Sequence, residues 1–492
     1  MKMKKICMLL ACAVTVSCND WFGITPDGSS VPEDRFFRNE NAYLNALTDI
    51  YTQLRAESLY GRTLSVGEVE FMGQNFRPTD ALQTAAASLD YTDATFAGAI
   101  EQTYVDMYRA IAACNNLIEH IETTRVVFND PDRKHIITGE LYGLRAALHF
   151  ELLRLFHPAW AVDPDFVGLR YMTHFGMTVS EPLSTRVFVE RVLADLDRAA
   201  EELRGHDPIF AGFSLSSVLP GEIDSRLRTF CMNYYAVRGM RARVCLYMGD
   251  YIQAAACAEE VFEHLTLVDK TYQLFHFCAP GEYGDDYSFS REHLFGVSTL
   301  PGGFDELTDR LYGEGGAVVT AHYAGLFPDS RDTRYRDWFD NSQPDRVRMS
   351  HKFGPQSVLS GYTSTGGSDQ VLPCRIPFIK LGEMALICTE ALVRQGDADA
   401  ATAAARLVEM QQARDVTEVA DLLTDPAFTT DQLLEYVERE YRRDFFGEGQ
   451  LFHYYKRLNR TSIPQYDGTE RAMTAADYTW PIPALSVQAN QL

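Results

Sequence analysis

The mature part of this sequence has no apolar run long enough to span a lipid bilayer. A membrane-spanning helix needs about 20 mostly apolar residues, and the nearest candidate, residues 6–16, is shorter and lies at the N-terminus. Lys2, Lys4 and Lys5 precede this stretch and the small Ser17 follows it, which is typical of a secretory signal peptide. We therefore expect residues 1–17 to be removed during export and no segment of the mature chain to cross the membrane.

Positive charge is also scarce. The chain has 45 Lys and Arg against 68 Asp and Glu, which gives a formal net charge of -23 at pH 7. Binding to nucleic acid depends on clusters of Lys and Arg that displace counterions from phosphates, and the sequence has no such cluster. Its composition therefore excludes a nucleic-acid partner.

Motifs of catalysis and of metal binding are missing as well. The sequence has no HExxH, no GxSxG, no glycine-rich phosphate loop and no Cys/His spacing typical of zinc. With 68 acidic residues, neighbouring carboxylates such as Asp285 and Asp286 arise by chance, and we interpret them as a solvated loop rather than a glycosidase pair. The sequence thus predicts a protein that is not an enzyme and needs neither a cofactor nor a metal ion.

Cysteine is present without the spacing of a disulfide or metal framework. Seven cysteines follow Cys18, an odd number, and no two form a CxxC motif. Most lie inside helical apolar patterns, which favours buried, unpaired thiols. Cys18 is different, because Thr15-Val16-Ser17-Cys18 is a loose lipobox. We expect Cys18 to carry a lipid that anchors the chain, with residues 18–40 as a tether; the alternative is a secreted protein with a free thiol at Cys18.

What the sequence does have is helical periodicity over most of residues 41–492. Apolar residues recur at intervals of three and four, for example at Leu44, Leu47, Tyr51 and Leu54. Two segments that begin with Gly-Asp, at Gly249 and at Gly396, share alanines five and nine residues after the glycine and a valine twelve after. We interpret them as a repeated helix pair, in which Gly ends one helix and Asp caps the next; generic helix packing is the alternative.

The periodicity is lost between about 275 and 375, a stretch rich in Gly, Tyr, Phe and Asp, hereafter the insertion. A long irregular segment with many aromatic residues favours a binding element over disorder. Aromatic rings can cover the apolar face of a sugar while polar side chains bind its hydroxyl groups; a small aromatic core is the alternative. The candidate ligand-binding residues are Trp338, Tyr287, Tyr283, Phe289, Tyr312 and Tyr323, with Tyr91 and Phe96 from an earlier loop.

Trp338 is the leading candidate because charged residues surround it in RYRDWFDN, and rings in such settings are often half exposed. Trp160 in His-Pro-Ala-Trp, by contrast, follows a Pro that stops a helix and is expected to pack against the helix end.

Several separated segments together resemble the SusD/RagB family of outer-membrane nutrient-binding lipoproteins. They include PEDRFFRNENAYLNALTDIYTQL after the tether, GELYGLRAALHFELLRLF, the two Gly-Asp segments, and RRDFFGEGQLFHYYKR near the C-terminus. In the last segment the family usually has Arg two residues after the Gly, whereas Leu451 stands here, which indicates a subgroup.

The resemblance implies an all-α domain of about four tetratricopeptide-like helix pairs, with long irregular insertions that form a ligand face. It also implies a protein that is anchored in the outer membrane, faces the cell exterior, binds glycans and delivers them to a SusC-like TonB-dependent transporter. Some members bind peptides instead, so the cargo stays open between the two. A surface glycosidase and a protein-binding scaffold are the remaining alternatives.

Overall fold

The structure is a computed structural model that describes residues 36–176, 180–212, 223–269, 273–278, 287–299, 303–349, 352–353 and 375–484. Residues 1–17, Cys18 and the candidate Tyr283 lie outside these ranges, so the predicted signal peptide and lipidation site stay predictions.

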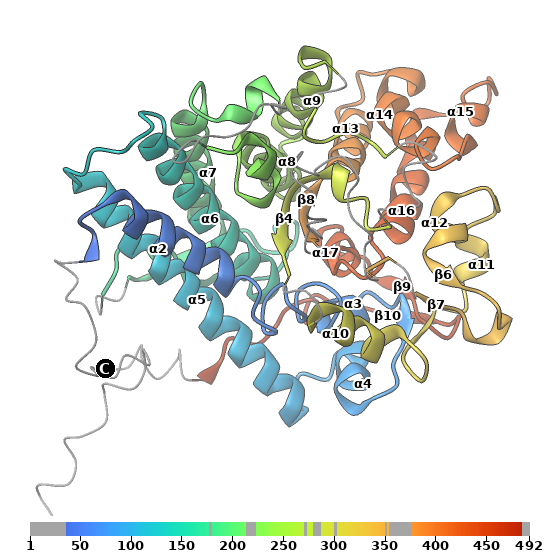
Figure 1. The fold of residues 1–492 in the computed structure, drawn as a ribbon. Coiled ribbons are helices and arrows are strands. Elements are labelled where there is room, and N and C mark those ends of the chain that lie inside the picture. The colour runs from blue at the N-terminus through green and yellow to red at the C-terminus, as the bar shows by residue number, and fades with distance from the viewer. Residues whose placement is uncertain are drawn as a thin grey trace, which may run out of the picture.

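Eight long helices form the body of the molecule, here called the helical body, as four successive hairpin pairs (Figure 1). The pairs are α2 (Glu40–Gln53) with α5 (Ala94–Thr123), α6 (Arg133–Phe156) with α7 (Thr185–Leu203), α8 (Tyr234–Met248) with α9 (Tyr251–Leu267), and α13 (Leu381–Gln395) with α14 (Ala400–Gln412). Each pair also packs against the next, through α5 and α6, α7 and α8, and α9 and α13. The all-α prediction with four tetratricopeptide-like pairs is confirmed.

Side-chain caps explain why several of these helices begin where they do. Asp93, Ser184 and Asp250 each accept a hydrogen bond from a backbone N–H in the first turn of the helix that follows. Along α6 the buried residues cover the whole circumference rather than a single stripe, because α5, α7 and α8 pack around it. The helix α6 is therefore the central element of the first half of the chain.

The two Gly-Asp segments form helix pairs as predicted, but their registers differ. Gly249 and Gly396 both end a helix in the left-handed conformation, with φ of 82° and 79°. The cap of the second helix is Asp250 in the first pair, whereas in the second pair it is Asp399, not Asp397. The buried residues shift accordingly, and the register predicted from the shared glycines is wrong by two residues.

This shift is visible in the alanines. Ala254, Ala258 and Val261 are buried in α9, as expected, whereas Ala401 and Ala405 of α14 are exposed. The buried positions of α14 are Ala403, Ala404, Leu407, Met410 and Gln411. Two additional residues in the turn therefore rotate α14 relative to the position that the sequence repeat predicts.

The insertion contains short helices and strands among its loops. These are β4 (His293–Ser298), α10 (Gly303–Tyr312), β5 (Val318–Val319), α11 (Tyr323–Leu326), α12 (Thr333–Asp337), β6 (Phe339–Asp340) and β7 (Arg348–Met349). They lie beside the helical body, in yellow in Figure 1. The strand β4 pairs with β8 (Arg375–Lys380), which leads directly into α13, so the insertion is joined to the helical body through a sheet.

The remaining α-helices and strands lie outside the helical body and the insertion. They are α3 (Glu68–Met72), β1 (Phe76–Arg77), α4 (Ala81–Ser88), β2 (Val167–Arg170), β3 (Pro182–Ser184), α15 (Glu418–Leu422), α16 (Leu433–Asp444), α17 (Gln450–Arg457), β9 (Ser462–Pro464) and β10 (Glu470–Ala472). The described strands make five two-stranded antiparallel sheets.

The C-terminal segment returns to the N-terminal helices. The side chain of Trp480 is 1% exposed, and its backbone N–H donates to the carbonyl of Leu155 in α6 at 2.9 Å. Its ring meets Phe96 and Phe156 edge-on at 6.0 and 5.7 Å. Residues from both ends of the chain thus complete one core.

The described residues contain no helix that is both long and apolar enough to cross a membrane. The six described cysteines after Cys18 are free, and five of them are buried, in agreement with the sequence prediction of unpaired thiols; the seventh, Cys374, lies outside the described ranges.

Candidate functional site

Most of the aromatic residues predicted to bind ligand are packed in the protein interior. Five are buried: Trp338, Phe289, Tyr312 and Tyr323 in the insertion, and Phe96 in α5. Because these five rings are buried, none of them presents a face to which a sugar could bind. The prediction that they are exposed ligand contacts is therefore wrong. The physical reason is that the insertion needs an apolar core of its own, and large aromatic side chains supply most of it.

Trp338 shows this clearly, because its side chain is 0% exposed. The indole N–H donates to the carbonyl of Tyr287 at 2.7 Å, Phe289 packs on the ring at 5.1 Å, and the Lys352 ammonium lies 4.0 Å from the ring centroid. The flanking charges that suggested exposure point elsewhere: Arg336 pairs with Asp337 at 2.8 Å.

Tyr287 and Tyr91 are half-buried. Tyr91 donates from its hydroxyl to the carbonyl of Asp477 at 2.5 Å, and burial raises the pKa of that hydroxyl well above its usual value. The backbone of Tyr287 accepts from Trp338. Of the eight predicted aromatic residues, these two and the undescribed Tyr283 remain candidates for ligand contact.

The insertion is held against the helical body by buried ion pairs that converge on Asp444 at the end of α16. Lys380 lies 2.8 Å from one carboxylate oxygen of Asp444, and the guanidinium groups of Arg334 and Arg414 lie 3.2 Å from the other. Each of these four side chains is 5% exposed or less. We call this set, together with Lys352, Glu448, Glu440 and Glu292, the buried ionic cluster.

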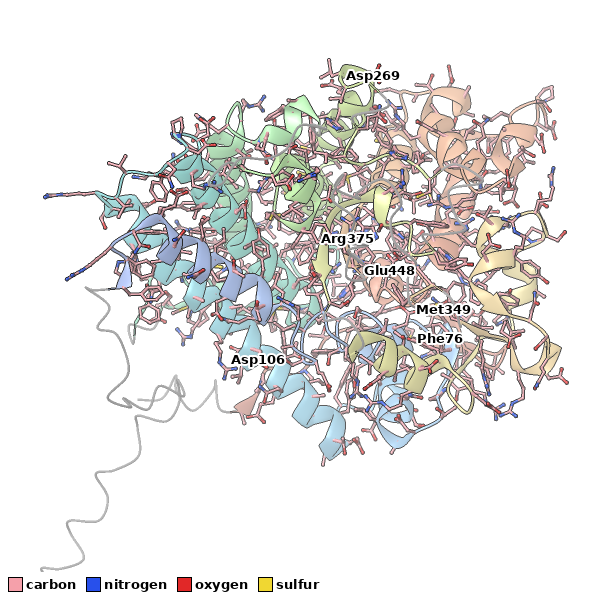
Figure 2. All side chains as sticks on the ribbon, in the orientation of Figure 1. Phe76, Asp106, Asp269, Met349, Arg375 and Glu448 are labelled. Carbon is pink, nitrogen blue, oxygen red and sulfur yellow. The ribbon has the colours of Figure 1, made fainter. Side chains whose placement is uncertain are left out.

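The other members of the buried ionic cluster extend it in both directions. Glu448 accepts from Lys352 at 2.6 Å and from Lys380 at 2.9 Å, while Glu292 receives two hydrogen bonds from Arg414 at 2.6 and 2.7 Å. Figure 2 shows Glu448 near the centre of the molecule, close in the view to Arg375 of β8. A charged cluster at this depth must be internally neutralised, because an unpaired buried charge costs several kcal/mol.

Electrostatics in the buried ionic cluster favours the charged carboxylates. Burial raises the pKa of Asp444, but Lys380, Arg414 and Arg334 outweigh it and hold that pKa well below its usual value. Burial likewise opposes ionisation of Glu440, yet Arg334 and Arg443 lower its pKa to about 2. Burial lowers the pKa of Lys352 to about 8 against the attraction of Glu448.

A surface hollow of about 580 Å³ lies where the insertion meets α16. That volume falls within the range of about 300–1,000 Å³ that is usual for ligand pockets. The hollow is lined by Ala321, His322, Gly325 and Leu326 from the insertion and by Glu435, Glu438, Arg439 and Arg442 from α16. We call it the insertion hollow.

Three side chains of the insertion hollow leave polar groups without a partner among the described residues. Glu435 and Arg442 make no ion pair there, and Nε2 of His322 makes no hydrogen bond, although His322 interacts electrostatically with Asp467. Glu438 and Arg439 are already engaged, with Arg460 and Glu418. A free carboxylate, guanidinium and imidazole supply both acceptors and donors, which is the combination that polyhydroxylated ligands require.

Two larger hollows lie on the helical body, beside His206 (600 Å³) and beside His120 (920 Å³). In the first, the charged groups are matched within the protein: His206 lies 2.7 Å from Asp132, and Asp207 lies 2.9 Å from Arg228. The insertion hollow has unpaired groups facing it, and it lies between the insertion and the C-terminal helix α16.

Sequence reasoning missed the insertion hollow. The solvent-facing side of the amphipathic helix α16 carries Glu435, Glu438, Arg439 and Arg442. Charged residues in this pattern occur on any solvated helix surface, so they do not indicate a binding site. The charged residues that share the hollow with His322 lie more than a hundred residues further along the chain, so no local sequence pattern connects them. Among the described residues, no three metal-binding side chains converge, here or elsewhere.

Comparisons with known proteins agree with this architecture. Residues 332–491 match the model of the SusD family. No match was found among curated proteins. A putative sugar-binding protein from Bacteroides vulgatus is 18% identical, with a TM-score of 0.70, over 93% of this chain and 98% of that one. A SusD superfamily protein from Bacteroides thetaiotaomicron is 20% identical, with a TM-score of 0.68, over 92% and 98%.

A laminarin-binding SusD-like protein is 16% identical, with a TM-score of 0.61, over 92% of this chain and 98% of that one. At these identities the likeness establishes the fold, which extends over nearly the whole chain.

Proposed function

Because residues 332–491 belong to the SusD family and the chain shares the fold of SusD superfamily structures almost throughout, we propose that this protein binds glycans and has no catalytic activity of its own. The observation that carries the proposal is the combination of the family match with the insertion hollow. Its unpaired carboxylate, guanidinium and imidazole can bind hydroxyl groups without any proton transfer. No Phe, Tyr or Trp lines the hollow, so it recognises hydroxyl groups rather than the apolar faces of sugar rings.

We propose further that the protein acts at the cell surface, lipidated at Cys18 in the outer membrane, and passes its ligand to a SusC-like TonB-dependent transporter. The signal peptide and lipobox in the sequence support the anchor, and the family supports the transporter. Replacing Cys18 by Ala is expected to move the mature protein from the membrane fraction to the soluble fraction. A variant that stays in carbonate-washed membranes would contradict the lipid anchor.

Binding is best tested by calorimetry with purified mature protein and a panel of oligosaccharides that includes laminarin fragments. Once a ligand is found, Arg442→Ala is expected to weaken binding roughly tenfold, because hydrogen bonds to charged groups contribute about 1.5–3 kcal/mol. Arg331→Ala is the matched control: Arg331 is 68% exposed, pairs with Asp329 and lies outside the hollow.

The possible outcomes distinguish a wrong binding site from a wrong function. If both variants bind as the wild type does, the glycan lies elsewhere, and Tyr287 and Tyr91 are the next residues to replace. If no oligosaccharide binds but a peptide library does, the cargo is peptide and the glycan proposal fails. Release of reducing ends from a bound polysaccharide would show a glycosidase instead.

A further inference from the structure

A small, partly open cavity lies where the helical body meets α16 and α17; it shares the helix α16 with the insertion hollow but none of its lining residues. Its volume is about 40 Å³, enough for roughly three water molecules at about 10–15 Å³ each. Five helices supply its walls: α6, α8, α13, α16 and α17. The charged side chains that line it are Arg154, Arg243, Glu383, Lys456 and Arg457, together with the ring of His453.

The three arginines that line this cavity are each matched by a carboxylate. Arg154 donates twice to Glu151, at 2.9 and 2.7 Å, and Arg243 donates twice to Glu383, at 2.6 Å each. Arg457 donates twice to Glu390, at 2.8 and 2.6 Å. These groups form a network, because Glu390 also pairs with Arg394 at 2.8 Å and Arg243 lies 3.8 Å from Glu151; within it the three arginines that line the cavity face three carboxylates.

Lys456 is the exception. Its side chain is 1% exposed, and it donates to the carbonyl of Leu155 at 3.2 Å, but it makes no ion pair with a carboxylate anywhere in the described ranges. A lysine ammonium has three N–H donors, so at least one hydrogen bond remains to be made. Burial and the nearby Arg154 both lower the pKa of this amine well below its usual value.

A second polar group is left without a partner at the same place. Nδ1 of His453, one turn before Lys456 on α17, is buried and makes no hydrogen bond within the described part of the chain. His453 lines the same cavity, and burial, reinforced by Arg154 and Lys456, keeps its pKa well below the usual value, so its ring is neutral. A neutral imidazole can donate one N–H to an anion.

We propose that this cavity binds a small monovalent anion, of the size of chloride, held by the Lys456 ammonium. With Lys456 protonated, the wall carries one cation more than its carboxylates neutralise, although the whole chain has an excess of 23 negative charges. An isolated buried charge is costly, and a bound counterion removes most of that cost. The volume excludes anything as large as an oligosaccharide, so this site is independent of the proposed glycan binding.

The direct test is to crystallise the mature full-length protein from sodium bromide and to measure anomalous scattering. The proposal expects a bromide peak in the cavity within hydrogen-bonding distance of Lys456 Nζ, and its loss in Lys456→Met. A cavity that holds water alone would overturn it, because Lys456 is then an uncharged amine. A peak that persists in Lys456→Met would also overturn it, since that result indicates an adventitious ion only.

Thermal unfolding supplies a second measurement in solution. At constant ionic strength, replacing gluconate by chloride is expected to raise the Tm of the wild type by about 1–2 °C, because an anion that binds the folded state alone stabilises it. Lys456→Met should lose that shift. Lys134→Met, the same substitution near the start of α6 and outside the cavity, should keep it.

A Tm that is equally insensitive to chloride in all three proteins would contradict the proposal. If Lys456→Met fails to fold, Lys456→Gln replaces it in both experiments, and the wild-type bromide map alone is sufficient to decide.

Discussion

The helical body and the insertion are stabilised in different ways. In the helical body each helix packs mainly against its neighbours in sequence, along buried apolar residues and behind side-chain caps. The insertion has short helices and two-residue strands, and it is fixed by an aromatic core and by the buried ionic cluster around Asp444. One region depends on local contacts, whereas the other depends on partners up to about a hundred residues away.

This difference has an energetic consequence. A buried ion pair contributes little net stability compared with apolar packing, but removing one partner is costly because the other charge stays buried. The insertion is therefore expected to be more sensitive to single charge-neutralising substitutions, and the helical body to changes in turns and packing.

Asp444→Asn should have the largest effect. The substitution leaves Lys380, Arg334 and Arg414 without the carboxylate they share, which is expected to cost about 3–5 kcal/mol of unfolding free energy. Urea unfolding measures the loss, and hydrogen exchange should show faster opening of α12 and β6 while α6 is unchanged. Equal loosening of both regions would abolish the distinction between them.

The control for that experiment is Asp197→Asn. Asp197 pairs with Arg241 at 2.8 Å, but its side chain is 56% exposed, so the same chemical change should cost less than about 1 kcal/mol.

Trp338→Ala tests the aromatic core of the insertion. Removal of a fully buried Trp is expected to cost about 3–5 kcal/mol, and the affinity for a verified glycan should change little in the protein that remains folded. Trp160→Ala, at a half-buried ring under the Arg186 guanidinium, should cost less. A melting curve that is unaffected by Trp338→Ala, with binding weakened about tenfold, would restore Trp338 as a ligand contact.

Acid should weaken the buried ionic cluster. The pKa of Glu440 is about 2 in the folded chain against its usual 4.5, so its contribution is complete above about pH 4.5 and is lost as the pH falls toward 2. Between about pH 6 and about pH 3 the loss is on the order of 2 kcal/mol for this group. In this pH range Glu440→Gln should take up about one proton fewer on unfolding, so its unfolding free energy should depend less steeply on pH. An unchanged slope would show that Glu440 is not ionised through these contacts.

Two glycines of the helical body provide the smallest effects, with opposite signs. Gly396→Ala should destabilise by about 1 kcal/mol, because φ is +79° there although the space around a new Cβ is open. Gly98→Ala, in the second turn of α5 and equally open, should stabilise by about 0.4–1 kcal/mol. Gly249→Val and Gly396→Val should cost slightly more than the alanine variant, about 1–2 kcal/mol. Two alanine variants of the same sign in thermal unfolding would contradict the assignment of Gly396 as a helix end.

The helices of the helical body could be predicted because apolar residues recur along them at regular intervals. Repeats of three and four and the Gly-Asp turns identify helix pairs from neighbouring residues alone. The register of α14 was not predictable from the shared glycine, since two extra turn residues move the cap from Asp397 to Asp399. Local sequence thus identifies the helices, but it does not determine how a longer turn rotates one helix relative to the next.

The insertion was predictable in position but not in the exposure of its residues. The charges around Trp338 favour a surface site, yet the ring is buried because Tyr287, Phe289 and Lys352 reach it from other segments. The same limit hid the insertion hollow, which joins His322 to Arg442 across more than a hundred residues. Local sequence patterns do not predict contacts between residues so far apart in the chain.

The position of Trp480 bears on when the protein can fold. Its ring fills a space between Phe96 and Phe156, and its backbone closes on Leu155. The helices α5 and α6 are made early in synthesis, but the side chain that completes their core follows only after α7 to α17 have been made. Domains in general fold as units once their chain has emerged, and here the N-terminal helices must wait, with an apolar groove open to water, until Trp480 has left the ribosome. The core of the first helices therefore cannot be completed while the second half of the chain is still being synthesised.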